Sequence, residues 1–259
     1  LAKYADYEAW KHLEKGKVIC STRIEPPLHL EGPEKIVKDF GLWPEPDVED
    51  GWREKEFDEF VGRSIDENLD KITKGCFAPW MMYKEDFLSI GGHDPIFHSC
   101  REDSDVFNRL VLKGYDLIQS WTSYVYHLTA RAGQFQHGKL TKDHSEKSSE
   151  WRKMMDNSTR EYFRKWGCPV LHDEYMMPII PPKYDIGFVV HNIKYDLLHI
   201  LEPWCSTIYI GTHIPIINYV SNEGENTKYN LQSRVWYIPE HFDAKEMNDI
   251  IVEFHADHL

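Results

Sequence analysis

The chain has 259 residues, of which 41% are hydrophobic and 14% aromatic, enough for one large domain or two modest ones. This composition argues against intrinsic disorder, and a formal net charge of −13 argues against nucleic-acid binding, which needs clustered lysine and arginine. No run approaches the roughly 20 apolar residues of a membrane span, and the first residues do not have the pattern of a signal peptide.

The first third of the chain predicts alternating helices and strands. Apolar residues spaced four apart predict one helix over residues 1–15, and residues 17–24 predict a strand. Residues 34–40 predict a short helix, and residues 55–72 predict an amphipathic helix with one apolar face. The apolar and aromatic run at 75–83 predicts a buried strand.

A pair of glycines separates the next predicted elements. Residues 84–90 predict a short helix that ends at Gly91 and Gly92, because glycine adopts a left-handed backbone at little steric cost. Aromatic and β-branched residues then predict two strands, at 115–121 and 123–128.

Three carboxylates gather at the start of the helix between these segments. The residues from Ser99 to Glu102 match the S-x-x-E capping box, which predicts a helix beginning there. Glu102, Asp103 and Asp105 then lie in or near the first turn, where the helix dipole favours each negative charge by about 0.3–1 kcal/mol. Acidic residues occur at helix N-termini for this reason alone, so the cluster by itself does not define a site.

The second half of the chain predicts a loop, a long helix, a linker and a small α/β unit. The polar residues after His127 predict a loop, and residues 145–166 predict an amphipathic helix. Three prolines within 171–183 indicate a linker or a rigid crossing. Three short apolar strands follow, at 184–191, 206–211 and 249–254.

Helical stretches separate these last strands, which predicts a parallel βαβαβ unit with right-handed crossovers. The unit contains neither G-x-G-x-x-G nor a P-loop, so we assign it no nucleotide site. Six histidines lie in the last third without an H-E-x-x-H pair, which argues against a metal site there. A metal hydrolase built on these histidines and acids has no motif in its favour.

A run of about fifty residues resembles nucleotide-sugar glycosyltransferases of the GT-A fold, similar to family 2. Phe87 to Gly114 matches the pattern F-x-x-I-G-G-x-D-x-x-F…E-D-x-D-x-x-x-R-L-x-x-x-G. The order of motifs also matches: a glycine-containing segment comes first, an x-E-D motif that opens a helix follows, and a histidine comes later. In addition, the turn-like segment from Ser21 to Pro27 resembles a turn in these transferases. The resemblance implies a partial GT-A-like mixed sheet with flanking helices, within an overall α/β protein.

The resemblance also implies catalytic roles. In inverting members the aspartate of x-E-D is the general base, which would be Asp103, with Glu102 helping to orient the acceptor. A carboxylate suits this role because a sugar hydroxyl is a poor nucleophile. The late histidine, His127, would complete the shell of a Mn²⁺ or Mg²⁺ ion at the nucleotide diphosphate, where a divalent ion offsets growing negative charge.

The acceptor is expected to be a carbohydrate or another hydroxyl compound near the double glycine. Trp80 has an alternative role in core packing, and Asp94 is also explained as a turn residue. The expected acceptor-binding residues are Trp80, Tyr83, Gly91, Gly92, Asp94 and Arg101.

The chain departs from the family in one respect. GT-A enzymes carry a D-x-D motif upstream, after nucleotide-binding strands, whereas residues 1–15 predict a helix. The letters Asp103-Ser104-Asp105 form D-x-D, but inside the x-E-D helix. We therefore expect a truncated GT-A-like domain at 1–170 without its nucleotide-binding half, a linker at 171–183 and a small α/β domain of unknown function at 184–259.

Two classes of function follow from these observations. The first is an inverting glycosyltransferase that moves a sugar from a nucleotide-sugar donor to an acceptor hydroxyl. The second is a non-catalytic carbohydrate- or partner-binding module derived from such an enzyme. Five cysteines without a C-x-x-C pair indicate a reducing, cytoplasmic setting in either case.

Overall fold

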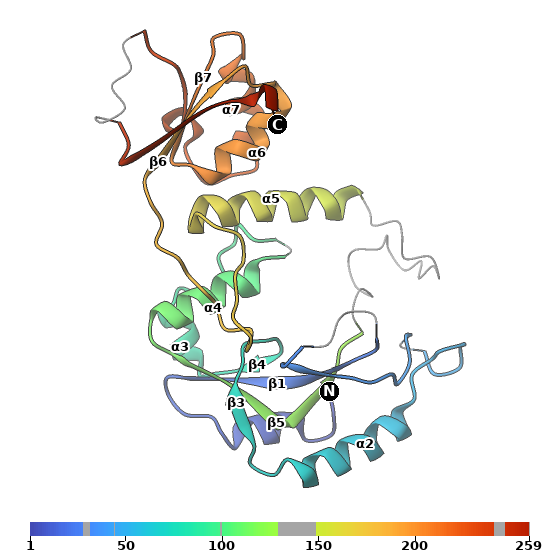
Figure 1. The fold of residues 1–259 in the computed structure, drawn as a ribbon. Coiled ribbons are helices and arrows are strands. Elements are labelled where there is room, and N and C mark those ends of the chain that lie inside the picture. Colours follow the sequence, from blue (N-terminus) through green and yellow to red (C-terminus); the bar gives the residue numbers. More distant parts are fainter. Residues whose placement is uncertain (28–31, 44, 99, 129–148, 241–246, 259) are drawn as a thin grey trace. The chain divides into compact units, whose positions relative to one another are not determined.

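The computed structural model describes residues 1–27, 32–43, 45–98, 100–128, 149–240 and 247–258 of an α/β protein (Figure 1). Its contacts divide the chain into two compact units. The first unit comprises residues 1–94, 103–152 and 170–179, and the second comprises residues 95–102, 153–169 and 180–259. In the described ranges no helix is both long and apolar enough to cross a membrane.

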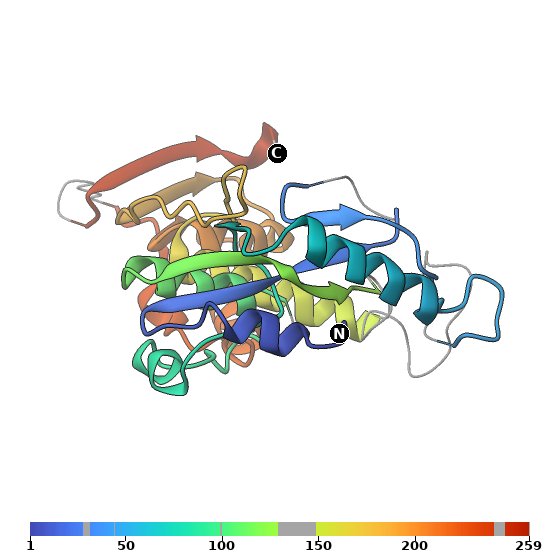
Figure 2. The ribbon, with the colours of Figure 1, turned by 90° about the horizontal axis from the view of Figure 1, so that it is seen from below.

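The first unit contains a mixed five-stranded sheet centred on two long strands. Strand β1 (Lys17–Glu25) pairs in parallel with β5 (Asp116–Tyr126) on one side and with the short β2 (Lys35–Val37) on the other. The antiparallel strand β3 (Ile72–Lys74) extends the sheet beyond β5, and β4 (Trp80–Met81) pairs with the start of β1. Figure 2 shows β1 and β5 running side by side.

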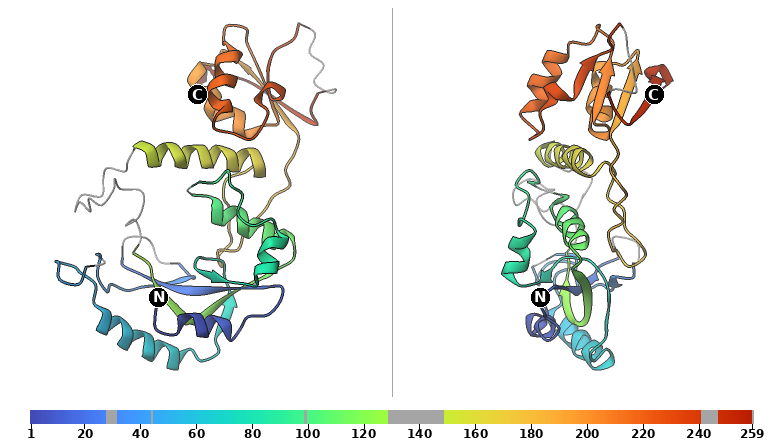
Figure 3. Two further views of the ribbon diagram at one scale, coloured as in Figure 1. Left: turned by 180° about the vertical axis from the view of Figure 1, so that it is seen from behind. Right: turned by 90° about the vertical axis from the view of Figure 1, so that its left-hand side faces the viewer.

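Helices cover both faces of this sheet (Figures 1 and 3). Helices α1 (Ala5–Trp10) and α2 (Glu54–Glu67) lie on one face, where Ala5, Phe57 and Val61 pack against Ile24 and Tyr124 of the sheet. Helix α4 (Glu102–Leu112) lies on the other face and follows the short α3 (Lys84–Ser89). Its side chains Val106, Phe107 and Leu110 pack against Val18 and Cys20 of β1.

The predicted helix over residues 1–15 is much shorter in the structure. The backbone N–H of Ala2 donates to the carbonyl of Tyr124 at 3.0 Å, so the first residues are drawn to β5 rather than into a helix. Tyr4, with φ of 65°, precedes the helix, and α1 ends at Trp10.

The predicted helix over residues 34–40 is wrong, because Lys35–Val37 forms strand β2. Ile36 aligns with Ile24 of β1 and packs on the same core as α1 and α2, so sheet pairing overrides the local preference. The helix predicted over 55–72 ends instead at Glu67, and Ile72 belongs to β3.

Two predicted strand patterns also differ from the structure. Of the strand expected over 75–83, the structure has only the two residues of β4. The two strands expected between 115 and 128 are one strand, β5, whose register against β1 shifts next to Ser21 and Thr22. Such an irregularity interrupts alternation without ending the strand, which explains why the pattern predicts two elements.

The second unit contains a parallel four-stranded sheet, as the sequence predicts, in the order β8-β7-β6-β9. Its strands are β6 (Ile186–His191), β7 (Thr207–Ile210), β8 (Val235–Tyr237) and β9 (Ile250–His255), of which β8 is not predicted. Its helical segments are α6 (Tyr195–Leu201), α7 (Ile216–Gly224), the 3₁₀ turns Glu202–Trp204, Leu231–Ser233 and Ala256–His258, and most of α5 (Ser149–Trp166).

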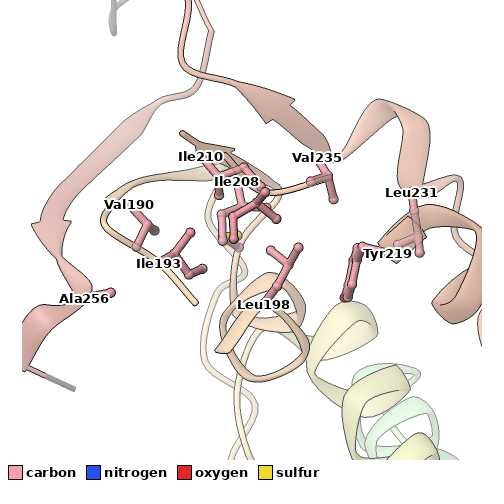
Figure 4. Packing of buried hydrophobic residues seen from close by; sticks show 11 residues of the cluster. Val190, Ile193, Leu198, Ile208, Ile210, Tyr219, Leu231, Val235 and Ala256 are labelled. Atoms are coloured by element: carbon pink, nitrogen blue, oxygen red, sulfur yellow. The ribbon is translucent and has the colours of Figure 1, made fainter. Parts of the chain in front are cut away.

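The core of the second unit lies between its sheet and the helices α6 and α7 (Figure 4). Val190, Ile208 and Ile210 point from the strands toward Leu198 of α6 and Tyr219 of α7, and all five side chains are almost completely buried. Burial of such side chains stabilises a fold by about 1.5–3 kcal/mol each.

A buried ion-pair network joins α5 to this layer. The guanidinium of Arg164 donates to Glu202 Oε2 at 2.6 and 3.0 Å, to Glu223 Oε1 at 2.7 Å and to Glu161 Oε1 at 2.7 Å. Burial opposes the charge on Arg164, but the neighbouring Glu202 and Glu223 carboxylates raise its pKa. These bonds attach α5 firmly to the second unit.

Candidate functional site

The candidate site lies in the first turn of α4, whose residues from Asp103 onward belong to the first unit. The predicted capping box would make Glu102 the third helical residue, but Glu102 is the first residue of α4, so that prediction is wrong in register. Ser99, its expected cap, lies outside the described residues. Cys100 and Arg101 precede the helix with φ of 66° and 71°, a left-handed conformation that turns the chain sharply before Glu102.

Asp103 lines a cavity of about 70 Å³ in the first unit. Its Oδ1 accepts hydrogen bonds from the backbone N–H of Ser104 at 2.6 Å and from the Ser104 hydroxyl at 3.3 Å. Phe77, Phe107 and Asn108 form further parts of the cavity wall. The first turn of α4 therefore presents one carboxylate to a small, mostly apolar space.

The segment 170–179 forms the opposite wall of this cavity. Asp173 Oδ1 accepts from the backbone N–H groups of Tyr175 and Met177 at 2.8 and 2.9 Å, and Ile179 N–H donates to the Leu171 carbonyl at 3.0 Å. Most of the expected linker 171–183 is thus an ordered turn of the first unit. It contributes apolar side chains and the imidazole of His172 to the wall.

Cys76, which lines the cavity, is a weak candidate for a nucleophile. Burial, together with the neighbouring Cys20 and Asp103, raises the pKa of the Cys76 thiol. A thiol that stays protonated at neutral pH is a poor nucleophile, so the carboxylate of Asp103 is the stronger candidate for chemistry.

A buried group of charges extends along β1 from this cavity. The guanidinium of Arg23 lies over the ring of Phe77, which lines the cavity, and donates to Glu34 Oε1 at 2.7 Å. Arg23 Nη1 also lies 2.7 Å from Glu25 Oε1. Burial lowers the pKa of Arg23, while the negative charges of Glu25, Glu34 and Asp103 act in the opposite direction.

Glu25 connects this group to His127. Its Oε1 lies 2.6 Å from His127 Nδ1, and its Oε2 accepts from Lys35 Nζ at 3.1 Å. Burial opposes ionisation, but the hydrogen bond with His127 and the charges of Arg23 and Lys35 lower the pKa of Glu25 to about 2. Glu25 is therefore a carboxylate at neutral pH, and His127 Nδ1 carries the proton that it accepts.

When His127 is neutral and its Nδ1 donates to Glu25, the lone pair of Nε2 is available to bind a ligand. The His127 side chain is 44% exposed. Histidines that bind metals usually donate their other ring N–H to a carboxylate in this way. The described residues contain no group of three or more metal-ligating side chains. His127 therefore fits the role of one metal ligand, and the described side chains do not complete the shell.

The expected acceptor-binding residues do not share the cavity of Asp103. The ring of Trp80 packs 5.0 Å from that of Phe107, in the core beneath α4, while Tyr83 precedes α3 and is 38% exposed. Gly91 and Gly92 end α3 with φ of 89° and 67°, as the sequence predicts. The described lining of the cavity includes none of Trp80, Tyr83, Gly91, Gly92, Asp94, Arg101, Glu102 or His127.

Several residues of the site have no role in the sequence-based prediction. Ser21 to Pro27 was expected to be turn-like, but its residues up to Glu25 belong to strand β1. Arg23 and Glu25 lie two apart on β1 and thus point to the same face, and both are buried. The presence of these two charged residues in a predicted strand was the sequence feature that could have pointed to them. Phe77 and His172 gave no signal, because only the folded chain brings them to α4.

Comparison of the chain with protein-family models, curated proteins and solved structures finds no match.

Proposed function

We propose that the first unit is the acceptor-side part of an inverting GT-A-type glycosyltransferase, which moves a sugar from a nucleotide-sugar donor to an acceptor hydroxyl. The proposal rests on the sequence resemblance around Asp103 and on the arrangement of the charges along β1. Its chemistry needs a carboxylate base in a cavity and a cation site for the diphosphate.

One observation carries the proposal. Asp103 and His127 are both associated with the buried Arg23–Glu25 pair: Arg23 lies over Phe77 in the wall of the Asp103 cavity, and Glu25 holds His127 at 2.6 Å. The proposed base and the proposed ligand are thus both linked to charged residues of β1.

Asp103 is the proposed general base. Ser104 holds its Oδ1, and its other oxygen has no hydrogen-bond partner among the described residues. In this role that oxygen would accept the proton of an acceptor hydroxyl as the hydroxyl attacks the sugar. Glu102, at the first position of α4, is the proposed orienting residue.

His127 is the proposed protein ligand for Mn²⁺ or Mg²⁺ through Nε2, with Glu25 fixing the tautomer of its ring. When bound, the ion would offset the charge of the leaving diphosphate. Arg23 and Lys35 keep Glu25 ionised, so that its carboxylate accepts the hydrogen bond from Nδ1 and fixes the orientation of the His127 ring.

The first test compares Asp103→Asn with the wild type in a complete enzyme, that is, in a protein that also carries the nucleotide-binding half that donor binding requires. We expect sugar transfer from a panel of nucleotide sugars, with Mn²⁺ present, to fall about 100-fold or more, because acid–base assistance contributes 10²–10⁴-fold. The readout is nucleoside diphosphate released with acceptor present. Asp116→Asn, an equal change of charge at an exposed residue of β5, is the control and should keep full activity.

The same assay separates the proposal from the alternative of a non-catalytic carbohydrate- or partner-binding module. Binding of an acceptor sugar without any transfer would support the module. Full activity of Asp103→Asn would remove Asp103 from the role of base.

The second test concerns His127→Ala. We expect Mn²⁺-dependent binding of a nucleoside diphosphate, measured by titration calorimetry, to weaken at least about tenfold, since loss of a supporting group alone costs 10–100-fold in metal affinity. His93→Ala, at an exposed histidine of the same unit, is the control. Unchanged metal dependence would exclude His127 as a ligand.

A further inference from the structure

The second unit contains a cavity of about 280 Å³ that none of the expected functions uses. Helix α5 contributes one wall, the segment that follows α7 contributes another, and residues 96–98 close a third side. Sites for small molecules usually measure about 300–1,000 Å³, so this cavity suits a ligand of one ring.

Two carboxamides form a rigid polar wall. Asn157 Nδ2 donates to Asn226 Oδ1 at 3.1 Å, and Asn226 Nδ2 donates to the carbonyl of Asn222 at 3.1 Å. Arg160 donates to Asn157 Oδ1 at 2.5 Å and is itself held by Glu223 at 2.8 and 3.0 Å. Each carboxamide has two donors and two acceptor lone pairs, so both keep capacity for a ligand in a fixed orientation.

Two hydroxyls add to this wall. Thr227 Oγ1 accepts from the backbone N–H of Tyr229 at 3.1 Å, which orients the hydroxyl and leaves its own proton to donate. Ser158, on α5, lines the same cavity and is 3% exposed. A ligand here meets amide and hydroxyl groups, which hydrogen-bond to hydroxyls as donors and as acceptors.

The remaining lining favours an uncharged ligand with an apolar face. Glu225 and Lys228 carry opposite charges, and Ile96 and Met154 offer apolar surface. The imidazole of His98 completes the lining and can donate or accept a hydrogen bond. A sugar ring combines these properties, since it is neutral, carries hydroxyls around its edge and presents C–H groups on its faces. A phosphate or a carboxylate would need a net positive lining.

We propose that this cavity binds a neutral sugar residue, independently of the chemistry proposed for the first unit. The site would hold part of a glycan, and its residues would contribute affinity rather than catalysis.

The test is saturation-transfer NMR on the full chain with neutral hexoses and N-acetylhexosamines, beside a hexuronate and a free hexosamine as charged probes. We expect the neutral sugars to bind and the charged ones to bind more weakly. Thr227→Val keeps the shape but removes the hydroxyl, and should weaken binding roughly 3- to 10-fold, the value of one hydrogen bond. Thr212→Val, at an exposed residue outside the cavity, should change nothing.

Met154→Trp provides a second variant, because Met154 is 39% exposed and a larger ring can fill the cavity without disturbing the core. This variant should abolish binding while the thermal melting curve stays unchanged. The proposal is overturned if no neutral sugar gives a signal, if the charged sugars bind better, or if neither variant weakens binding. Failure here would leave the Asp103 assays unaffected, because they report on the other unit.

Discussion

At the scale of single residues, the buried pair of Arg23 and Glu25 is the most informative feature of the first unit. Buried ion pairs contribute little net stability, because desolvation offsets most of their attraction. Breaking one is costly, since the partner charge is left uncompensated. Glu25 compensates the charges of Arg23 and Lys35 and accepts a hydrogen bond from His127, which explains why a carboxylate occupies this buried strand.

We expect Glu25→Gln to make the stability of the protein less dependent on pH. The pKa of Glu25 is about 2 in the folded chain against an ordinary value of 4.5, so its contribution is full above pH 4.5 and is lost as the pH falls toward 2. This shift corresponds to about 3 kcal/mol. Urea unfolding at pH 7 should therefore show Glu25→Gln less stable than the wild type by about that amount.

The difference between the two proteins should shrink as the pH falls to 2.5. Glu14→Gln, at an exposed glutamate of the same unit, should follow the wild type at every pH. A gap between Glu25→Gln and the wild type that stays constant from pH 7 to pH 2.5 would contradict the assignment of a lowered pKa to Glu25.

At the scale of elements, α5 shows how buried charges attach a helix in addition to aromatic contacts such as that of Phe163 with Trp204. Arg164, on α5, meets carboxylates from its own helix, from the turn after α6 and from α7. Tyr219 adds a hydroxyl that donates to Glu202 at 3.1 Å, and Arg234 also donates to Glu202. The orientation of α5 therefore depends on a network in which each carboxylate meets at least one cation.

Arg164→Met should destabilise the second unit by about 3–5 kcal/mol, because it leaves buried carboxylates without their main partner. Thermal unfolding followed by circular dichroism measures the loss. Arg152→Met, at an exposed position of the same helix, is the matched control and should stay within about 0.5 kcal/mol of the wild type. A similar loss in both variants would mean that burial of the charge is not the cause.

At the scale of the whole molecule, the chain consists of two units that interleave in sequence. Residues 95–102 and most of α5 belong to the second unit, while 170–179 belong to the first. The expected boundaries, with a linker at 171–183, assume that each domain is one continuous stretch. These continuous boundaries remain a prediction. The contacts of the folded chain place most of α5 in the same unit as the second sheet.

The sequence by itself determined the elements whose pattern is local and strong. The double glycine after α3, the amphipathic α2 and α5, and the parallel α/β character of the last third follow from spacing, β-propensity and glycine conformation. The carboxylate of Asp103 at a helix start was also predictable, although the helix begins two residues later than the capping box indicates.

Only the tertiary structure decided β2, the shortness of α1 and the environment of the site. Lys35–Val37 is a strand because β1 offers it an edge, and the first residues leave the helix because β5 offers Ala2 a carbonyl. Glu25 and His127 meet across 102 positions of sequence, through the parallel pairing of β1 with β5. Local pattern cannot encode such a contact, because it depends on which strands become neighbours after the chain has closed long loops.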